Sequence, residues 1–273
     1  MTAPLNIAHR GASAYAPENS FAAFDLALAL GSTMLEMDVQ QTRDGDLVVV
    51  HDDTIERTLR GLDHPLLRVC DLTWDELSQL DAGSWFNDIR PEMQRPEYVG
   101  TRVLRLEEVF GRYGRSVPYF IELKHPSCGT GMEAEIADLV RLYGLVERND
   151  SNVIIGAFSQ KCLYKLHDHD AAIGLVQLFH SYATSSAIRA YLGALPSYCM
   201  GIGPPYEAID ERLLFAARQY DLGVYAWTVN DPEHMIALID YGVTGVMTDF
   251  PDLLDDLLTH STRRHDRRAG LYL

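Results

Sequence analysis

Residues 34–51 have the sequence MLEMDVQQTRDGDLVVVH. Two short runs within this stretch, 34–39 and 47–51, are rich in apolar residues and predict two strands. Asp44-Gly45 lies between them and is typical of a tight turn, and the interval is too short for the helix that a parallel crossover needs. We therefore expect residues 47–51 to pair antiparallel with the first run, as a hairpin arm.

Short apolar runs recur along the whole chain and alternate with helical patterns, which predicts a parallel sheet covered by helices. Strands are expected at residues 5–9, 34–39, 47–51, 118–123, 152–156, 173–178, 197–202, 223–228 and 244–248. Helices are expected from Phe21, capped by Asn19 or Ser20, to the stop at Gly31, at 132–143, at 210–221, and from Asp231-Pro232 to Gly242. With the arm set aside, eight strands remain for a barrel, and such barrels accommodate 273 residues in one domain.

The composition limits the classes of partner. The chain has 23 lysines and arginines against 39 aspartates and glutamates, a net charge of -16, which disfavours nucleic acid as a partner. No apolar run approaches the roughly 20 residues of a membrane span, and residues 1–10 lack the apolar stretch of a secretory signal, so we expect a cytoplasmic protein. The four cysteines form no CxxC pair and are expected to be buried as small hydrophobic side chains.

Residues 52–105 break the alternation, because they are rich in proline and glycine and too long for a simple barrel loop. A helical pattern lies near 73–80, and several large apolar side chains could bury surface: Trp74, Leu77, Leu80, Trp85 and Phe86. We predict a small inserted cap over the strand ends, within a single domain of residues 1–273. Residues 260–273 contain four arginines and are expected to form a solvated basic tail, with a contact to anions as the alternative.

Three acidic side chains are expected to point into the barrel. Glu36 and Asp38 are two residues apart in a strand and so share one face, and Glu122 and Lys124 repeat this spacing. The alternate residues of these strands face the helices: Leu35, Met37, Val39, Ile121 and Leu123. Such pairs often mark only a solvated edge, but both lie at carboxyl ends of strands, where barrel active sites gather. Three carboxylates without a cysteine suit Mg²⁺, Ca²⁺ or Mn²⁺.

Two histidines are expected near these carboxylates. His9 ends the first strand and precedes Arg10, whereas His51 ends the hairpin arm. In a hairpin with its turn at Asp44-Gly45, the residue numbers of two paired residues add up to about 88 or 89. This places residue 51 roughly opposite residue 36. A lone histidine at a strand end is usually structural. Two of them beside a metal site could instead supply the proton acceptor and the proton donor of a reaction.

Several short motifs occur in a fixed order between residue 7 and about residue 254. They are His9-Arg10-Gly11, Pro17-Glu18-Asn19-Ser20, Glu36-x-Asp38, Asp44-Gly45 leading to His51-Asp52, Glu122-x-Lys124, Trp227-Thr228-Val229-Asn230 and Gly245-Val246-Met247-Thr248-Asp249-x-Pro251. As an ordered set they resemble the glycerophosphodiester phosphodiesterases. Ser20 departs from the commoner threonine. Thr58-Leu59-Arg60-Gly61 departs from the usual threonine-asparagine-glycine, so the alcohol group of the substrate is not predicted.

The resemblance implies a (β/α)8 barrel with the hairpin arm after its second strand and a family-type insertion after His51. It implies that one divalent cation is bound by three ligands, Glu36, Asp38 and Glu122. It also implies that His9 and His51 are the acid and the base, that Arg10 and Lys124 hold the phosphate, and that Trp227 forms an aromatic wall beside the substrate. For Trp227 an ordinary core position is the alternative, because it shares an inward face with Tyr225.

The reaction implied is hydrolysis of a glycerophosphodiester, a small-molecule partner, to glycerol 3-phosphate and an alcohol. The cation explains how an anionic substrate could approach three carboxylates. Cleavage of the lysophospholipase D or sphingomyelinase D type, in a related barrel, is an alternative. A non-catalytic phosphate-binding scaffold is another, although every chemical position is intact. The oligomeric state is left open.

Overall fold

A closed barrel of parallel strands organises the chain. The computed structural model describes residues 3–62, 66–124, 131–147, 150–193, 195 and 198–269. Within these residues the barrel consists of β1 (Leu5–Ala8), β2 (Met34–Gln41), β5 (Tyr119–Leu123), β8 (Val153–Ala157), β9 (Gly174–Leu178), β10 (Cys199–Gly203), β11 (Gly223–Ala226) and β12 (Gly245–Thr248). Strand β1 pairs in parallel with both β2 and β12, which closes the ring. The predicted (β/α)8 fold is confirmed.

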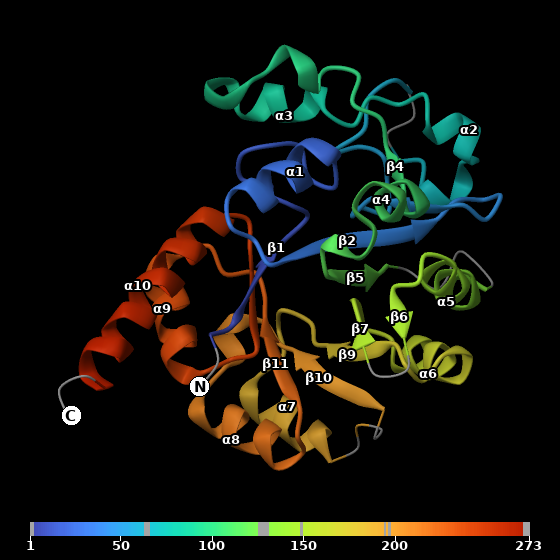
Figure 1. The fold of residues 1–273 in the computed structure, drawn as a ribbon. Helices are drawn as coiled ribbons and strands as arrows, with labels where there is room; N and C mark the ends of the chain where they lie inside the picture. Colours follow the sequence, from blue (N-terminus) through green and yellow to red (C-terminus); the bar gives the residue numbers. More distant parts are fainter. Residues whose placement is uncertain are drawn as a thin grey trace.

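Helices surround the barrel, as Figure 1 shows. They are α1 (Phe21–Ala29), α4 (Leu106–Tyr113), α5 (Met132–Leu142), α6 (Gln160–His169), α7 (Ser185–Leu192), α8 (Glu211–Gln219), α9 (Pro232–Tyr241) and α10 (Pro251–Ala269). Ser20 caps α1, because its hydroxyl oxygen accepts a hydrogen bond from the Ala23 amide at 3.2 Å, whereas Asn19 has a left-handed backbone with φ 56°. Of the two predicted caps, Ser20 is therefore the cap and Asn19 is free for another contact.

The hydrophobic core has two layers, one on each face of the strands. The outer layer lies between strands and helices and includes the predicted helix-facing residues Leu35, Met37, Val39, Ile121 and Leu123. The inner layer fills the barrel below the site and includes Ile7, Met34, Phe120, Tyr225 and Met247. The alternation that aims the polar residues of β2 inward is thus confirmed by what their neighbours contact.

The hairpin arm is strand β3 (Leu47–Val49), which pairs antiparallel with β2. Val39 pairs with Val49, so the residue numbers of paired residues add up to 88. The same register would place residue 51 opposite residue 37, one residue from the predicted position 36. Strand β4 (Leu104–Arg105) pairs with the other edge of β3, and β6 (Val146–Glu147) pairs with β7 (Asp150–Ser151). These last three strands have two residues each, too few for a pattern to predict.

The insertion packs its apolar side chains against the arm and against α1. Its elements are η1 (Val69–Asp71), α2 (Trp74–Leu77), α3 (Ser84–Ile89), η2 (Pro91–Met93) and η3 (Pro96–Tyr98). One cluster joins Leu77 and Leu80 to Val48 of β3, and a second joins Trp85 and Phe86 to Ala23 of α1. Figure 1 shows α2 and α3 above α1 and β2, on the side of the barrel away from α7 and α8.

The structure also describes part of the predicted basic tail and three of the four cysteines. The predicted basic tail is helical over its described part, because α10 continues to Ala269, and residues 270–273 lie outside the described residues. Cys162 and Cys199 are buried as expected, Cys70 is only half-buried, and Cys128 lies outside the described residues. None of the helices in the described part of the chain is both long and apolar enough to cross a membrane.

Replacing Leu77 by alanine should lower the free energy of unfolding by about 2–5 kcal/mol, because the side chain is fully buried between the insertion and the arm. Urea unfolding, followed by fluorescence and by circular dichroism, measures the change. Leu66→Ala is the matched control, since Leu66 belongs to the same insertion but is 76% exposed. It should change stability by about 0.5 kcal/mol or less. Equal stability of both variants would contradict the packing described.

Candidate active site

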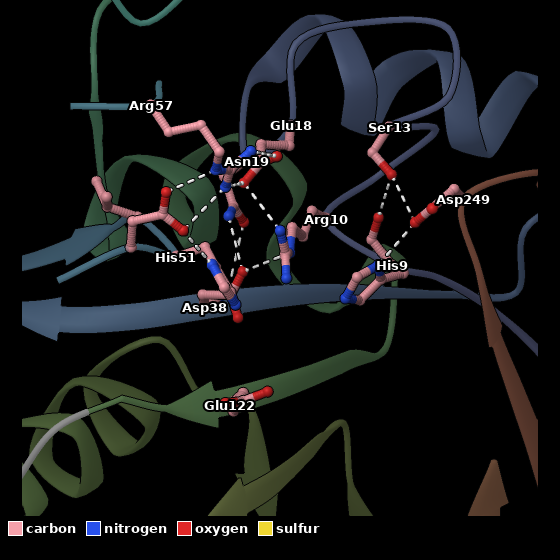
Figure 2. Close-up of polar contacts among 12 residues, drawn as sticks. His9, Arg10, Ser13, Glu18, Asn19, Asp38, His51, Arg57, Glu122 and Asp249 are labelled. Atoms are coloured by element: carbon pink, nitrogen blue, oxygen red, sulfur yellow. Dashed lines mark hydrogen bonds and ion pairs between the residues drawn. The ribbon is translucent and has the colours of Figure 1, made fainter. Parts of the chain in front are cut away.

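Polar side chains from four segments converge at the carboxyl ends of the first three barrel strands. Glu36 and Asp38 lie on β2, Glu122 lies on the neighbouring β5, and Asp38 pairs in register with Glu122. His9 and Arg10 follow β1, and His51 follows the arm β3. Figure 2 shows Arg10 and His51 beside Asp38, His9 farther along beside Ser13 and Asp249, and Glu122 on the adjacent strand. The predicted histidines and carboxylates are therefore brought together.

Three carboxylates form a cluster at this point. One oxygen each from Glu36, Asp38 and Glu122 lies within 4.8 Å of the other two. Asp38 Oδ1 and Glu122 Oε1 are buried and accept no hydrogen bond of regular geometry. An arrangement of three carboxylates with acceptor capacity left over fits a hard divalent cation, which prefers oxygen ligands. The predicted ligand set is thus sterically and chemically suited to Mg²⁺, Ca²⁺ or Mn²⁺.

Two cations balance part of this negative charge. Lys124 Nζ lies 3.1 Å from Asp38 Oδ1 and also contacts Glu122 Oε1. Arg10 Nε lies 3.0 Å from Asp38 Oδ2, and the Arg10 amide donates a hydrogen bond to Glu36 Oε2 at 2.7 Å. Burial opposes the charge on Lys124, but Asp38 and Glu122 outweigh it and raise the pKa of the lysine. Both predicted phosphate-binding residues therefore remain charged inside the site.

The carboxylates differ in how well they are balanced. Burial would raise the pKa of Asp38, but the charges of Arg10 and Lys124 outweigh it and hold this pKa well below its usual range. Asn19 supports Asp38 further by donating to Oδ2 at 2.9 Å. For Glu36 the opposite holds, because burial and the charges of Asp38 and Glu122 raise its pKa well above the usual value. With all three carboxylates ionised, the cluster would carry more negative charge than its two cations neutralise, and a divalent ion would supply the balance.

Backbone conformation places Arg10 in this site. Arg10 has a left-handed backbone with φ 58°, and Gly11 follows with φ 82°. A Cβ at Gly11 would lie 2.6 Å from the backbone of Ala23, so this position requires glycine. The strained turn brings the backbone amide of Arg10 to Glu36 and its side chain to Asp38. Unfavourable backbone conformations of this kind concentrate at functional sites.

Each histidine is held by a carboxylate. His9 Nδ1 lies 2.7 Å from Asp249 Oδ1, and His51 Nδ1 lies 2.5 Å from Asp52 Oδ1. A carboxylate only accepts hydrogen bonds, so each Nδ1 carries the proton and each Nε2 is left to act on another group. Sequence patterns assign no role to Asp249 or Asp52. The only signal for them is that they stand inside the family motifs, one beside His51 and one after the last strand.

Asp249 is itself fixed by two further side chains. Ser13 donates to Oδ1 at 2.9 Å, and Asn230 donates to Oδ2 at 2.6 Å. Burial would raise the pKa of Asp249, but the hydrogen bonds from His9, Asn230 and Ser13 lower it to about 2. The carboxylate therefore stays ionised at neutral pH and can stabilise a charged His9.

A cavity of about 580 Å³ opens beside the cluster. Its lining includes His51, Glu122 and Lys124 together with the aromatic rings of Phe158 and His180. Trp227 lies behind this wall, edge-on to Phe158 at 6.0 Å, and its indole nitrogen donates to the Gly203 carbonyl at 2.8 Å. Asp52 and Asp53 are the described residues of the insertion that line the cavity.

Comparison with known proteins gives a consistent result. The model of the "Glycerophosphoryl diester phosphodiesterase family" matches residues 9–253. The chain is 38% identical over 251 residues to the glycerophosphodiester phosphodiesterase of Bacillus subtilis strain 168. The aligned region covers 91% of this chain and 84% of that relative. It is 33% identical to a glycerophosphodiester phosphodiesterase of Caldanaerobacter subterraneus subsp. tengcongensis, over 93% of this chain and 97% of the relative.

Solved structures resemble the chain over nearly its full length. An Oleispira antarctica phosphodiesterase, in complex with the product sn-glycerol-3-phosphate, has a TM-score of 0.79 and 26% identity, and covers 94% of this chain and 97% of its own. A glycerophosphodiester phosphodiesterase from Agrobacterium tumefaciens has a TM-score of 0.73 and 27% identity, and covers 93% of this chain and 100% of its own.

Substituting Glu122 by glutamine should weaken binding of Mg²⁺ or Ca²⁺ by roughly tenfold or more, because an amide oxygen is a poorer ligand than a carboxylate. Isothermal calorimetry on the folded variant measures this affinity. Glu97→Gln, which alters a carboxylate that is 65% exposed on the insertion, is the control and should bind the ion normally. Unchanged affinity in Glu122→Gln and also in Glu36→Gln and Asp38→Asn would refute the proposed ligand set.

Asp249 should contribute stability that depends on pH. Its folded pKa of about 2 lies below the usual 3.8, so the contribution is fully present above about pH 5 and is lost as the pH falls toward 2. The full effect is about 2 kcal/mol. The difference in unfolding free energy between wild type and Asp249→Asn should therefore shrink between pH 6 and pH 3, measured by urea unfolding. The exposed Asp240, changed to asparagine, should show no such trend. A pH-independent difference for Asp249→Asn would contradict the assignment.

Proposed function

The chain belongs to the glycerophosphoryl diester phosphodiesterase family, and from this premise we propose how its site acts. It is an enzyme with glycerophosphodiester phosphodiesterase activity. The reaction we propose is metal-dependent hydrolysis to glycerol 3-phosphate and an alcohol. The observation that carries the proposal is the pair of carboxylate-held histidines beside a cluster of three carboxylates.

Binding of the phosphodiester relies on positive charge at the centre of the site. Glu36, Asp38 and Glu122 would hold one divalent cation, Mg²⁺ or Ca²⁺, with Mn²⁺ also suitable. When bound, the ion would withdraw electron density from the phosphoryl group and screen the carboxylates from the anionic substrate. Arg10 and Lys124 then supply hydrogen-bond donors for the phosphate oxygens. Lys124 is among the residues that line the cavity, which would place it beside a substrate bound there.

The two histidines share the proton transfers. An alkoxide leaving group is strongly basic, so its departure at neutral pH needs a proton donor, and the attacking oxygen needs a proton acceptor. One histidine must therefore be protonated and the other neutral when the substrate binds. The unperturbed pKa of imidazole, about 6.5, suits both tasks. Asp249 and Asp52 orient the rings so that each Nε2 faces away from its carboxylate partner and is available for transfer.

Two nucleophiles are compatible with this arrangement. Water can attack phosphorus directly, or the neighbouring hydroxyl of the glycerol group can attack first and form a cyclic phosphate that water then opens. Both routes need the same acceptor and the same donor, and both end at glycerol 3-phosphate. Phosphorus NMR during turnover distinguishes them, because only the second route passes through a cyclic phosphate.

Purified protein with glycerophosphocholine and Mg²⁺ or Ca²⁺ should release glycerol 3-phosphate, and chelation of the ion should stop the release. An enzyme-coupled assay of glycerol 3-phosphate measures the rate. His9→Ala and His51→Ala should each lower kcat/KM by roughly 10² to 10⁴-fold while calorimetry shows that the ion still binds. The wild-type pH profile of kcat/KM should be bell-shaped, because one group must be charged and the other neutral.

A substrate with a very acidic leaving group identifies the donor. Its departure needs no proton, so it should restore the rate of only one of the two alanine variants. A lysolipid is a further substrate in the same assay, because its cleavage would indicate activity of the lysophospholipase D type. Absence of product from every diester would leave a phosphate-binding scaffold and refute the proposed activity. Near-normal rates in both histidine variants would refute the two-histidine mechanism.

A further inference from the structure

Arg57 of the insertion binds two carboxylates at once. Its Nε and Nη2 donate to the two oxygens of Asp52 at 2.6 and 3.0 Å. Its Nη1 and Nη2 donate to the two oxygens of Glu18 at 2.7 Å each. The guanidinium thus uses four of its five N–H groups in two bidentate contacts, which a lysine ammonium cannot reproduce. Figure 2 shows Arg57 reaching from the insertion toward Glu18 and the site.

The two carboxylates lead to different parts of the site. Asp52 is the residue that holds Nδ1 of His51. Glu18 accepts a hydrogen bond from Arg10 Nη1 at 3.0 Å, and Arg10 in turn contacts Asp38. Arg57 is therefore joined to the acid–base group on one side and to the phosphate-binding group on the other.

The insertion fixes the guanidinium itself. Its central carbon lies 5.6 Å from the centre of the Trp85 ring, a distance suited to a cation–π contact. Trp85 is buried and packs with Phe86 and Tyr98 of the insertion and with α1. The apolar cluster of the insertion thus sets the place from which Arg57 reaches the site.

Arg57 and its carboxylate partners differ in exposure. The side chain of Arg57 is 43% exposed. Its partners are less exposed, with Glu18 at 10% and Asp52 at 21%. Burial would raise the pKa of Glu18, but Arg57 and Arg10 lower it, so Glu18 remains a charged acceptor for both arginines.

We propose that Arg57 is a positioning residue, which aligns His51 through Asp52 and Arg10 through Glu18. The insertion then belongs to the reaction machinery through one side chain, in addition to any part it has in selecting the alcohol. This inference rests on the acid–base role proposed for His51. A purely structural ion pair would instead tie the insertion to the barrel and leave the reaction itself unaffected.

Substituting Arg57 by glutamine should lower kcat on glycerophosphocholine by roughly 10²-fold, the size of effect expected when a catalytic group is displaced by about 1 Å. Arg57→Lys keeps the charge but loses the paired donors, so its kcat should lie between those of wild type and Arg57→Gln. Arg60→Gln is the matched control, because Arg60 is in the same segment and is 41% exposed, and it should keep normal kinetics. Thermal unfolding of all variants separates loss of positioning from loss of fold.

A kinetic double-mutant cycle with His51→Ala decides between positioning and structure. If Arg57 acts in part through His51, Arg57→Gln should lower kcat by a clearly smaller factor in the His51→Ala background than in wild type, and the loss that remains is the part transmitted through Arg10. A full additional loss in that background, or unchanged kcat in Arg57→Gln alone, would overturn the inference. If Arg57→Gln does not fold, the cycle with Arg57→Lys gives the same decision. Wild-type turnover and its loss in His51→Ala test the proposed function separately, so failure of one is distinguishable from failure of the other.

Discussion

The fully buried carboxylate of Asp38 is the charge on which the site depends. An isolated ionised carboxylate is very costly to bury, so the chain must supply partners for it. Arg10, Lys124 and Asn19 do so from three separate segments, each within about hydrogen-bond distance. Removing Arg10 or Lys124 would leave part of this charge uncompensated, and removing Asn19 would take a hydrogen bond from the carboxylate. The strained backbone at Arg10 and the left-handed backbone at Asn19 are both explained by this requirement, because they bring the two side chains to the same carboxylate.

The local parts of the site could be predicted from the sequence, and the long-range parts could not. Alternation along β2 aims Glu36 and Asp38 inward, and the Asp44-Gly45 turn fixes the register of the arm that carries His51. Both are consequences of period-two geometry over a few residues. The contact between His9 and Asp249 spans 240 residues and depends on closure of the barrel, which no local pattern contains. The surfaces against which the insertion packs were likewise not predictable, because the helical pattern near 73–80 identifies apolar side chains but not their partners.

Each of the two histidines is held by a carboxylate at Nδ1, but the two carboxylates come from different parts of the fold. His9 and Asp249 belong to the regular barrel, at the ends of strands that pair with one another. His51 and Asp52 are adjacent in the chain, at the end of the arm, and their surroundings come from the insertion. The barrel itself therefore holds the first histidine. The second is held by residues of the arm and the insertion, which lie outside the eight barrel strands.

Closure of the ring by pairing of β1 with β12 has a consequence for biosynthesis. The first strand to leave the ribosome carries His9, and the last strand to leave it is followed by the aspartate that orients that ring. Domains are synthesised from the amino terminus at roughly 5–20 residues per second, so for most of its synthesis the nascent chain lacks the carboxylate that holds His9. The contact that fixes the His9 ring can therefore form only after β12 and Asp249 have left the ribosome, so the site is completed late in synthesis.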